Sequence, residues 1–163
     1  MGKTIVMRAL EAKGVPYTYH KHARKQHTAA GVAEDLDIPV AWVVKAMIVK
    51  RESSPRSRRD FALVVVPGDR QLSLKKVAEA LGEKDVAMAL ERDVQRVTGF
   101  QVGAVSVVGF RRKDIVAFVD QGVLALEQAF ISSGRPDAGL ALAPEDLLRA
   151  IEGAQVGDFS TSA

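Results

Sequence analysis

The sequence predicts an α+β (α/β-type) domain in which helices surround a mixed, largely antiparallel, barrel-like β-sheet. Two mainly apolar runs are rich in β-branched residues, as is typical of buried strands: 42–50, which contains a lysine at position 45, and 61–66, which is unbroken. Shorter amphipathic segments predict helices, but they do not alternate regularly with the strands. Because a doubly wound parallel sheet needs that alternation, the α+β arrangement is favoured.

The N-terminal part is expected to form two helices separated by a short strand. Residues 2–13 place their apolar side chains on one helical face, and Gly14 is a common residue after a helix end. Residues 17–20 have a β-type composition. Thr28 is a suitable N-cap for a second helix that runs to Leu36.

The middle of the chain is expected to hold the two long strands and a third helix. The polar segment 51–59 joins the strands, and the run 61–66 is apolar enough to be central in a sheet. Ser73 is a suitable N-cap for a helix over 74–81, and Gly82 follows as its C-terminal glycine.

The C-terminal part is expected to add two helices and three strands. They are predicted as a helix at 91–97, strands at 115–119, 129–131 and 140–142, and a helix from Pro144 to Ile151. The small, polar residues after Gly153 predict a frayed end. We therefore expect a single domain over 1–155 and a flexible tail over 156–163.

Composition excludes several classes of function. The chain has no cysteine, which excludes disulfides, iron–sulfur clusters and thiol catalysis. No apolar stretch reaches the roughly 20 residues needed to cross a bilayer. The first residues lack the apolar core of a signal peptide, so a cytoplasmic location with no membrane partner is expected.

Basic residues gather in three clusters, at 20–27, 50–59 and 111–113. Such clusters suit a polyanion such as RNA, while the alternative is that they are solvated loops. The cations that we assign to nucleic-acid binding are Lys21, Arg24, Lys25, Arg56, Arg58, Arg59, Arg111 and Arg112.

Lys45 is the most informative residue, because it lies within an apolar run that reads as a strand. A buried ammonium must reach water, find a partner or hold a ligand. The sequence has no nucleophile elbow and no phosphate-binding Walker loop. His20 and His22 could share a strand face, but no further histidine or cysteine supports a metal site, so neither metal nor cofactor is expected.

Two further segments could take part in chemistry. Gly99 and Gly103 punctuate a stretch of small residues whose N–H groups could grip a carbonyl or an oxyanion, although a bulged strand is equally consistent. Ser132, Ser133 and Gly134 offer hydroxyls at a strand end, or form a plain turn.

In combination, these segments resemble the YbaK/ProX family of aminoacyl-tRNA editing domains, which includes insertion domains of prolyl-tRNA synthetase. The resemblance spans about residues 4 to 152 and implies the fold of that family. The similar segments occur in order at 28–30, 44–49, 63–69, 72–82, 87–89, 98–103, 132–134 and 142–147.

The resemblance implies a free-standing deacylase that hydrolyses, in trans, the ester of a mischarged tRNA, most often tRNA for proline carrying a small wrong amino acid. The implied partners are the tRNA acceptor stem and either prolyl-tRNA synthetase or an elongation factor, with the chain a monomer or weak homodimer. Two alternatives stay open: a non-catalytic module that binds tRNA or a synthetase, and a small-molecule-binding domain.

The resemblance also implies roles for individual residues. Lys45, Gly103 and Ala104 match the catalytic positions, with the last two as backbone donors to an oxyanion. Matches to the substrate pocket are Tyr19, Thr28, Ala46, Ser106, Val107, Ser132 and Gly134. The chain departs from the family pattern where Ala46 and Val107 replace a polar residue and a proline, and where Gly139 replaces a polar residue. A more apolar pocket is therefore expected.

Overall fold

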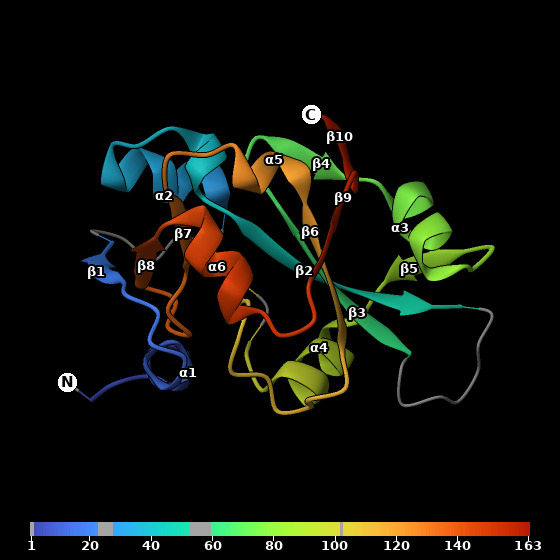
Figure 1. The fold of residues 1–163 in the computed structure, drawn as a ribbon, viewed down its shortest axis with the longest axis horizontal. Coiled ribbons are helices and arrows are strands. Elements are labelled where there is room, and N and C mark those ends of the chain that lie inside the picture. Colours follow the sequence, from blue (N-terminus) through green and yellow to red (C-terminus); the bar gives the residue numbers. More distant parts are fainter. Residues whose placement is uncertain (1, 23–27, 53–59, 102) are drawn as a thin grey trace.

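The computed structural model describes residues 2–22, 28–52, 60–101 and 103–163. Its largest sheet has the strand order β5-β2-β3-β6-β9 (Figure 1). In this sheet β2 (Lys45–Arg51) is antiparallel to β3 (Phe61–Val66) and to β5 (Val86–Met88). β6 (Val116–Asp120) is parallel to β3 and also to β9 (Gln155–Gly157).

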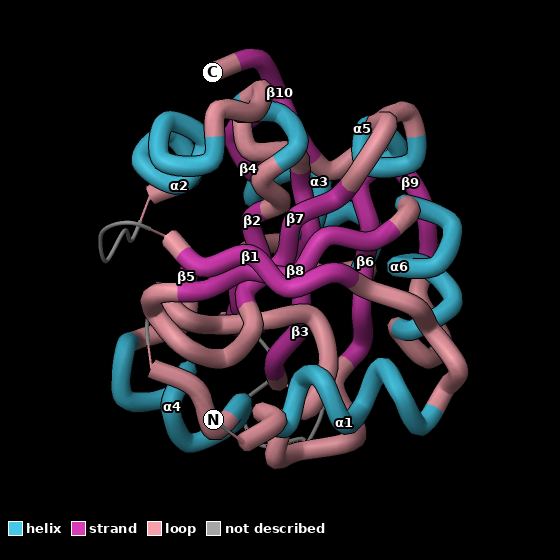
Figure 2. The backbone as a smooth tube through the Cα atoms, turned by 90° about the vertical axis from the view of Figure 1, so that its left-hand side faces the viewer, coloured by secondary structure: helices cyan, strands magenta, loops and turns pink. Residues whose placement is uncertain are grey.

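Two smaller antiparallel sheets complete the set of described strands. One has β8 (Ala138–Leu142) between β1 (Thr18–Lys21) and β7 (Ala129–Ser132), and it crosses in front of the five-stranded sheet in Figure 2. The other pairs β4 (Arg70–Leu72) with β10 (Ser160–Ser162). The α+β prediction with a mixed sheet is confirmed, and the described strands form three sheets that do not close into a barrel.

Helices pack around the sheets. They are α1 (Ile5–Ala12), α2 (Ala29–Leu36), α3 (Leu74–Leu81), α4 (Glu91–Thr98), α5 (Gln121–Leu124), α6 (Pro144–Ala150) and the 3-10 helix η1 (Val40–Trp42). The predicted caps are present, because Thr28 and Ser73 accept hydrogen bonds from backbone N–H groups three residues ahead, at 3.1 and 3.2 Å. Among the described helices, none has the length and apolarity to cross a membrane.

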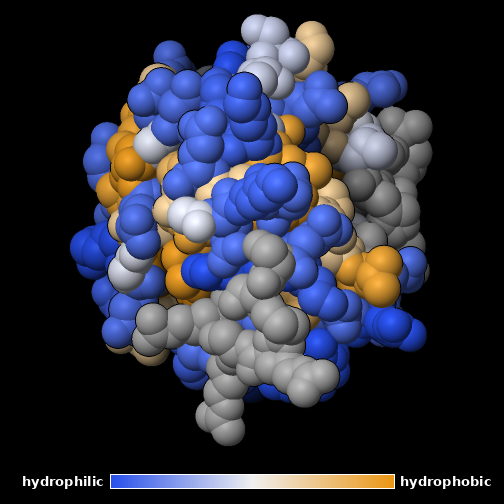
Figure 3. Space-filling model, turned by 90° about the vertical axis from the view of Figure 1, so that its right-hand side faces the viewer, coloured by the Kyte–Doolittle hydropathy of each residue, from blue (hydrophilic) through white to orange (hydrophobic). Residues whose placement is uncertain are grey.

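β3 is central, as predicted, and every one of its residues is buried. Because successive side chains of a strand point to opposite faces, β3 serves two hydrophobic cores. Leu63 and Val65 face a core shared with α1, α4, α6 and the three-stranded sheet, whereas Val64 and Val66 face a core covered by α3. The outer surface on the α3 and β5 side is mostly hydrophilic, with small hydrophobic areas (Figure 3).

The strand that carries Lys45 begins later than predicted. Trp42 ends η1, and Val43 forms an isolated bridge with Phe130 of β7. The Val44 N–H also donates to the Phe130 carbonyl, at 3.0 Å. Because Val43 and Val44 pair with β7 of another sheet, β2 begins only at Lys45. Lys45 is therefore the first residue of its strand and does not lie in the middle of it.

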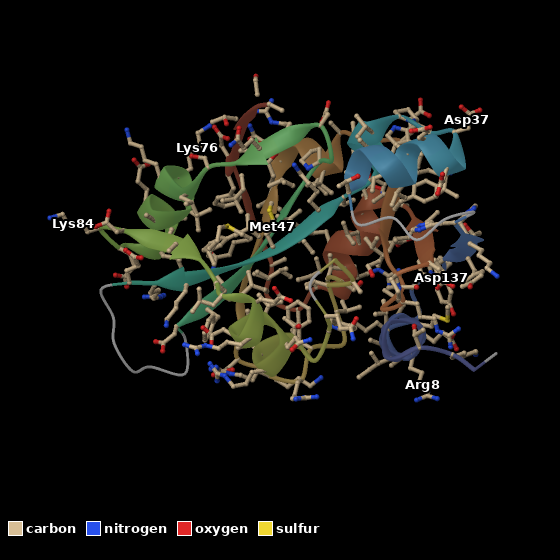
Figure 4. The ribbon with its side chains drawn as sticks, turned by 180° about the vertical axis from the view of Figure 1, so that it is seen from behind. Arg8, Asp37, Met47, Lys76, Lys84 and Asp137 are labelled. Carbon is tan, nitrogen blue, oxygen red and sulfur yellow. The ribbon has the colours of Figure 1, made fainter. Side chains whose placement is uncertain are left out.

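In contrast to the flexible tail expected over 156–163, this segment contains the end of β9 and all of β10. Phe159 is 5% exposed, and its ring centroid lies 4.9 Å from that of Phe118. The Phe159 N–H donates to Asp120 at 2.8 Å, and Lys76 of α3, labelled in Figure 4, pairs with Asp158. These contacts come from distant parts of the chain, so the polar composition of the tail does not reveal them.

Replacing Phe159 by alanine is expected to lower the free energy of unfolding by about 3–4 kcal/mol, because it leaves a cavity beside Phe118. Urea unfolding followed by circular dichroism measures this loss. The control is Val156→Ala at an exposed position of β9, where a loss below about 1 kcal/mol is expected. Equal, small losses in both variants would contradict a structural role for the tail.

Candidate active site

A cavity of about 710 Å³ is lined by residues of α2, η1, β2, β7 and β8, with further residues from β5, α4 and the loop that contains Gly103 and Val105. This volume lies in the range of small-molecule sites, which combine apolar walls with a few polar groups. The polar or charged side chains of the wall are His22, Thr28, Lys45, Glu91, Ser132 and Arg135.

Lys45 occupies a half-buried position in this wall, opposite Val66 at the end of β3. Its ammonium donates to the backbone carbonyl of Arg70. Burial lowers the pKa of Lys45, and the carboxylate of Asp69 acts in the opposite direction by favouring the charged form. An ammonium has three N–H donors, so Lys45 can hold this carbonyl and still donate to a ligand in the cavity.

The turn after β3 packs tightly behind Lys45. The Gly68 N–H donates to the Ala41 carbonyl at 3.3 Å, and a Cβ at position 68 would collide with the carbonyl oxygens of Val40 and Val43. Only glycine allows this approach of two backbones. The turn at Gly68 and the η1 segment are therefore fixed against each other, and their contact sets the position at which β2 begins.

Ser132 connects β7 to the loop that contains Gly103. Its hydroxyl donates to the Ala104 carbonyl at 3.0 Å and accepts from the Gly134 N–H at 3.1 Å. The buried hydroxyl of Ser106 donates to the Ser132 carbonyl at 2.6 Å. These bonds hold Gly103, whose φ is +92°, at the edge of the cavity.

The two predicted oxyanion donors differ in the structure. The Ala104 N–H donates to the Gln101 carbonyl at 2.9 Å within a turn, so in this conformation it is already used. Gly103, in contrast, lies in the cavity wall. Of this predicted pair, only Gly103 is placed to contact a ligand by its backbone.

The structure brings together part of the predicted substrate pocket. Besides Lys45 and Gly103, the cavity wall contains Thr28, Ala46 and Ser132. Five other residues that were predicted for the substrate pocket or the oxyanion site do not line this cavity: Tyr19, Ala104, Ser106, Val107 and Gly134.

The residues outside the wall have identifiable positions. Tyr19 is 40% exposed in β1, and Gly134 packs against Val6 and Phe100. Val107 is buried and faces a second cavity, which also contains Ile5. The replacement of a proline by Val107 therefore does not make the main cavity more apolar.

The predicted nucleic-acid contacts are described only in part, because Arg24, Lys25, Arg56, Arg58 and Arg59 lie outside the described residues. Lys21 and Arg111 are exposed. Arg112 pairs with Asp114 at 3.2 Å, and its guanidinium lies 5.8 Å from the centre of the Phe61 ring. These contacts give Arg112 a structural role in addition to any contact with RNA.

His22 is the wall residue that the sequence reasoning missed. It is 7% exposed and lies just after β1, although it belongs to the basic cluster at 20–27, for which a solvated loop was one of the two interpretations. The sequence pattern that could have indicated the burial of His22 is the alternation along the strand. His20 and His22 share one face, and Tyr19 and Lys21 share the other. Within the described residues, no cluster of three or more His, Asp or Glu side chains could hold a metal ion.

Comparison with known proteins assigns the chain to a family. The model of the aminoacyl-tRNA editing domain matches residues 23–150. A protein of Enterococcus faecalis named as a Cys-tRNA(Pro)/Cys-tRNA(Cys) deacylase, EbsC, is 30% identical, with 98% of this chain and 94% of that protein covered. Proline–tRNA ligase of Thermosipho africanus is 29% identical over 68% of this chain, which covers only 18% of the ligase.

A solved structure gives the same result. A protein described as a trans-editing enzyme for prolyl-tRNA synthetase superposes with a TM-score of 0.84 at 26% identity, with 97% of this chain and 96% of that chain covered. The family model spans most of the chain, and both whole-chain comparisons match it from end to end. The chain belongs to the aminoacyl-tRNA editing domain family.

Proposed function

We propose that this protein is a free-standing aminoacyl-tRNA deacylase, which hydrolyses the ester between a wrongly attached amino acid and the terminal ribose of a tRNA. The observation that carries the proposal is the cavity of about 710 Å³, where Lys45, Gly103 and Ser132 meet in a member of the editing-domain family. The match to nearly the whole length of a single-domain-sized deacylase relative supports action in trans.

Lys45 is the residue that acts on the ester. Its ammonium comes from the wall formed by β2 and can donate to the ester carbonyl or to the terminal phosphate. A positive charge in a partly dry cavity stabilises negative charge more strongly than it would in water. The backbone N–H of Gly103 is the second donor that the wall offers to the developing oxyanion.

The reaction needs no protein nucleophile, because an aminoacyl ester is already activated. A water molecule attacks the carbonyl carbon, and the bond from that carbon to the ribose oxygen breaks. The ribose oxygen takes a proton, and the amino acid leaves as a carboxylate with release of a proton. Holding the carbonyl and the water in line supplies much of the acceleration.

The tRNA partner follows from the same proposal. The relatives that match this chain include proline–tRNA ligases and a protein named for deacylation of Cys-tRNA(Pro), so tRNA for proline is the proposed substrate carrier. The proposed contacts to acceptor-stem phosphates are the exposed cations Lys21 and Arg111 and the further cations Arg24, Lys25, Arg56, Arg58, Arg59 and Arg112 of the basic clusters. Affinity that rests on such contacts falls as salt rises.

Lys45→Met is expected to lower kcat/KM for deacylation of mischarged tRNA by at least about 100-fold, because it removes the charge that stabilises the oxyanion. Single-turnover release of a radiolabelled amino acid measures the rate. Lys50→Met is the matched control, since Lys50 is an exposed lysine of the same strand, and it should keep the wild-type rate. Deacylation that survives Lys45→Met would refute the assigned role, and wild-type protein inactive on every mischarged tRNA would refute the function.

Lys45 is expected to titrate below its ordinary pKa of 10.5, because burial disfavours the charged form. The Asp69 carboxylate favours the ammonium, so Asp69→Asn should lower the pKa of Lys45 further. Nuclear magnetic resonance of ¹³C-methylated lysines measures both midpoints, and Lys45→Met identifies the signal by removing it. An Asp69→Asn midpoint equal to or above the wild-type midpoint would contradict this electrostatic account.

A further inference from the structure

His22 is a buried polar side chain, and no hydrogen bond of its ring to the described residues explains why it is buried. It is 7% exposed, and within the described parts of the chain neither Nδ1 nor Nε2 has a hydrogen-bond partner. Its backbone N–H, in contrast, donates to the Asp137 carbonyl at 2.8 Å. Burying a polar group without a partner costs free energy, so an imidazole in a cavity wall indicates that something else pairs with it.

The His22 imidazole lies beside Gly139 of the three-stranded sheet. Gly139 of β8 lies opposite Ser132 of β7 and opposite His20 of β1. A Cβ at Gly139 would lie 3.5 Å from the His22 Nε2, so the absence of a side chain there leaves space next to the ring. His22, Gly139 and Ser132 all line the cavity, and Asp137, labelled in Figure 4, marks this end of the sheet.

The protonation state of the ring suits recognition of a neutral group. Burial lowers the pKa of His22, while the carboxylates of Asp35 in α2 and Asp137 before β8 act in the opposite direction. A neutral imidazole has one donor and one acceptor. A hydroxyl or thiol, which can both donate and accept, is the complementary ligand group.

Lys45 begins β2 of the five-stranded sheet, whereas His22 follows β1 of the three-stranded sheet, and both line the cavity. If Lys45 and Gly103 hold the ester carbonyl, the side chain of the esterified amino acid occupies the rest of the cavity. That space is bounded mainly by apolar residues, among them Val43, Phe130 and Ala138. His22 is then one of the polar groups that a side chain in the cavity could meet, and both of its ring nitrogens lack a hydrogen-bond partner among the described residues.

We propose that His22 determines specificity by hydrogen bonding to a hydroxyl or thiol on the side chain of the esterified amino acid. The inference rests on the proposed deacylase function and deepens it, because it names the class of amino acid that is removed. A site with a buried hydrogen-bonding group discriminates against an analogue that leaves the group unpaired.

The test compares His22→Phe with the wild-type protein on tRNA charged with serine, threonine, cysteine or alanine. The variant should lose about 10- to 100-fold in kcat/KM on the three polar side chains, the size of one lost hydrogen bond. On alanyl-tRNA the change should stay within about twofold. His22→Gln, which keeps a donor and an acceptor, should restore part of the discrimination.

His20→Phe is the matched control, because His20 lies two residues away in the same strand and outside the cavity wall. It should leave the relative rates on the four esters unchanged. Thermal unfolding separates recognition from structure: His22→Phe should unfold at the wild-type temperature or above, since it removes an unpaired buried group. A fall in that temperature would instead indicate a structural histidine and overturn the proposal.

Equal losses on all four esters, or no loss on any, would also overturn the proposal while leaving the deacylase function intact. If the wild-type protein hydrolyses none of the four esters, a binding measurement decides the role of His22 separately from the deacylase function. The probe is 3′-seryl-amino-3′-deoxyadenosine, with its alanyl counterpart as control. A shift of the His22 ring ¹⁵N signals with the seryl compound alone supports the proposal, and no difference between the compounds overturns it.

Discussion

The close approach of the Gly68 backbone to the carbonyls of Val40 and Val43 is the constraint on which the site depends. It joins the turn after β3 to the segment that leads into β2. Lys45 begins β2 directly after that segment, and its ammonium reaches the carbonyl of Arg70 directly after the turn. Two chain segments from adjacent strands thus position one charge, and a side chain at position 68 would push them apart.

Local signals were enough to predict much of the fold but not its ends. The β3 run and the caps Thr28 and Ser73 could be predicted because burial and capping act over a few residues. β9 and β10 could not, because each has three residues and a polar composition. These strands are held in place by Phe159, whose ring packs on Phe118 and whose backbone N–H donates to Asp120, almost 40 residues away in sequence. Contacts of this kind leave no periodicity in the chain.

The same distinction explains the site. Lys45, Thr28 and Ser132 were identified through ordered similarity to a family, and all three line one cavity. Val107 and Ala104 were named with them because the resemblance matched the segment 103–107 to a loop of the family. The turn at Gly103 and the bonds from Ser106 and Ser132 leave Gly103 and Val105 in the cavity wall and Ala104 and Val107 outside it, so a match to the loop as a whole did not show which of its residues line the cavity. His22 was missed because its basic neighbours indicate a solvated loop, whereas its burial depends on the sheet.

Lys45 and His22 of the cavity wall differ in charge, and this difference suits them to two separate tasks. Burial lowers the pKa of both Lys45 and His22, but it acts on groups with very different ordinary values. Lys45 also has a carbonyl partner and a nearby carboxylate, which favour its charged form. His22 has no ring partner among the described residues. A charge that stabilises an oxyanion would attract any ester, whereas a neutral ring that needs a partner favours some side chains over others. Activation and selection can therefore be separated by mutation, because Lys45 and His22 belong to different segments of the chain, at the start of β2 and just after β1.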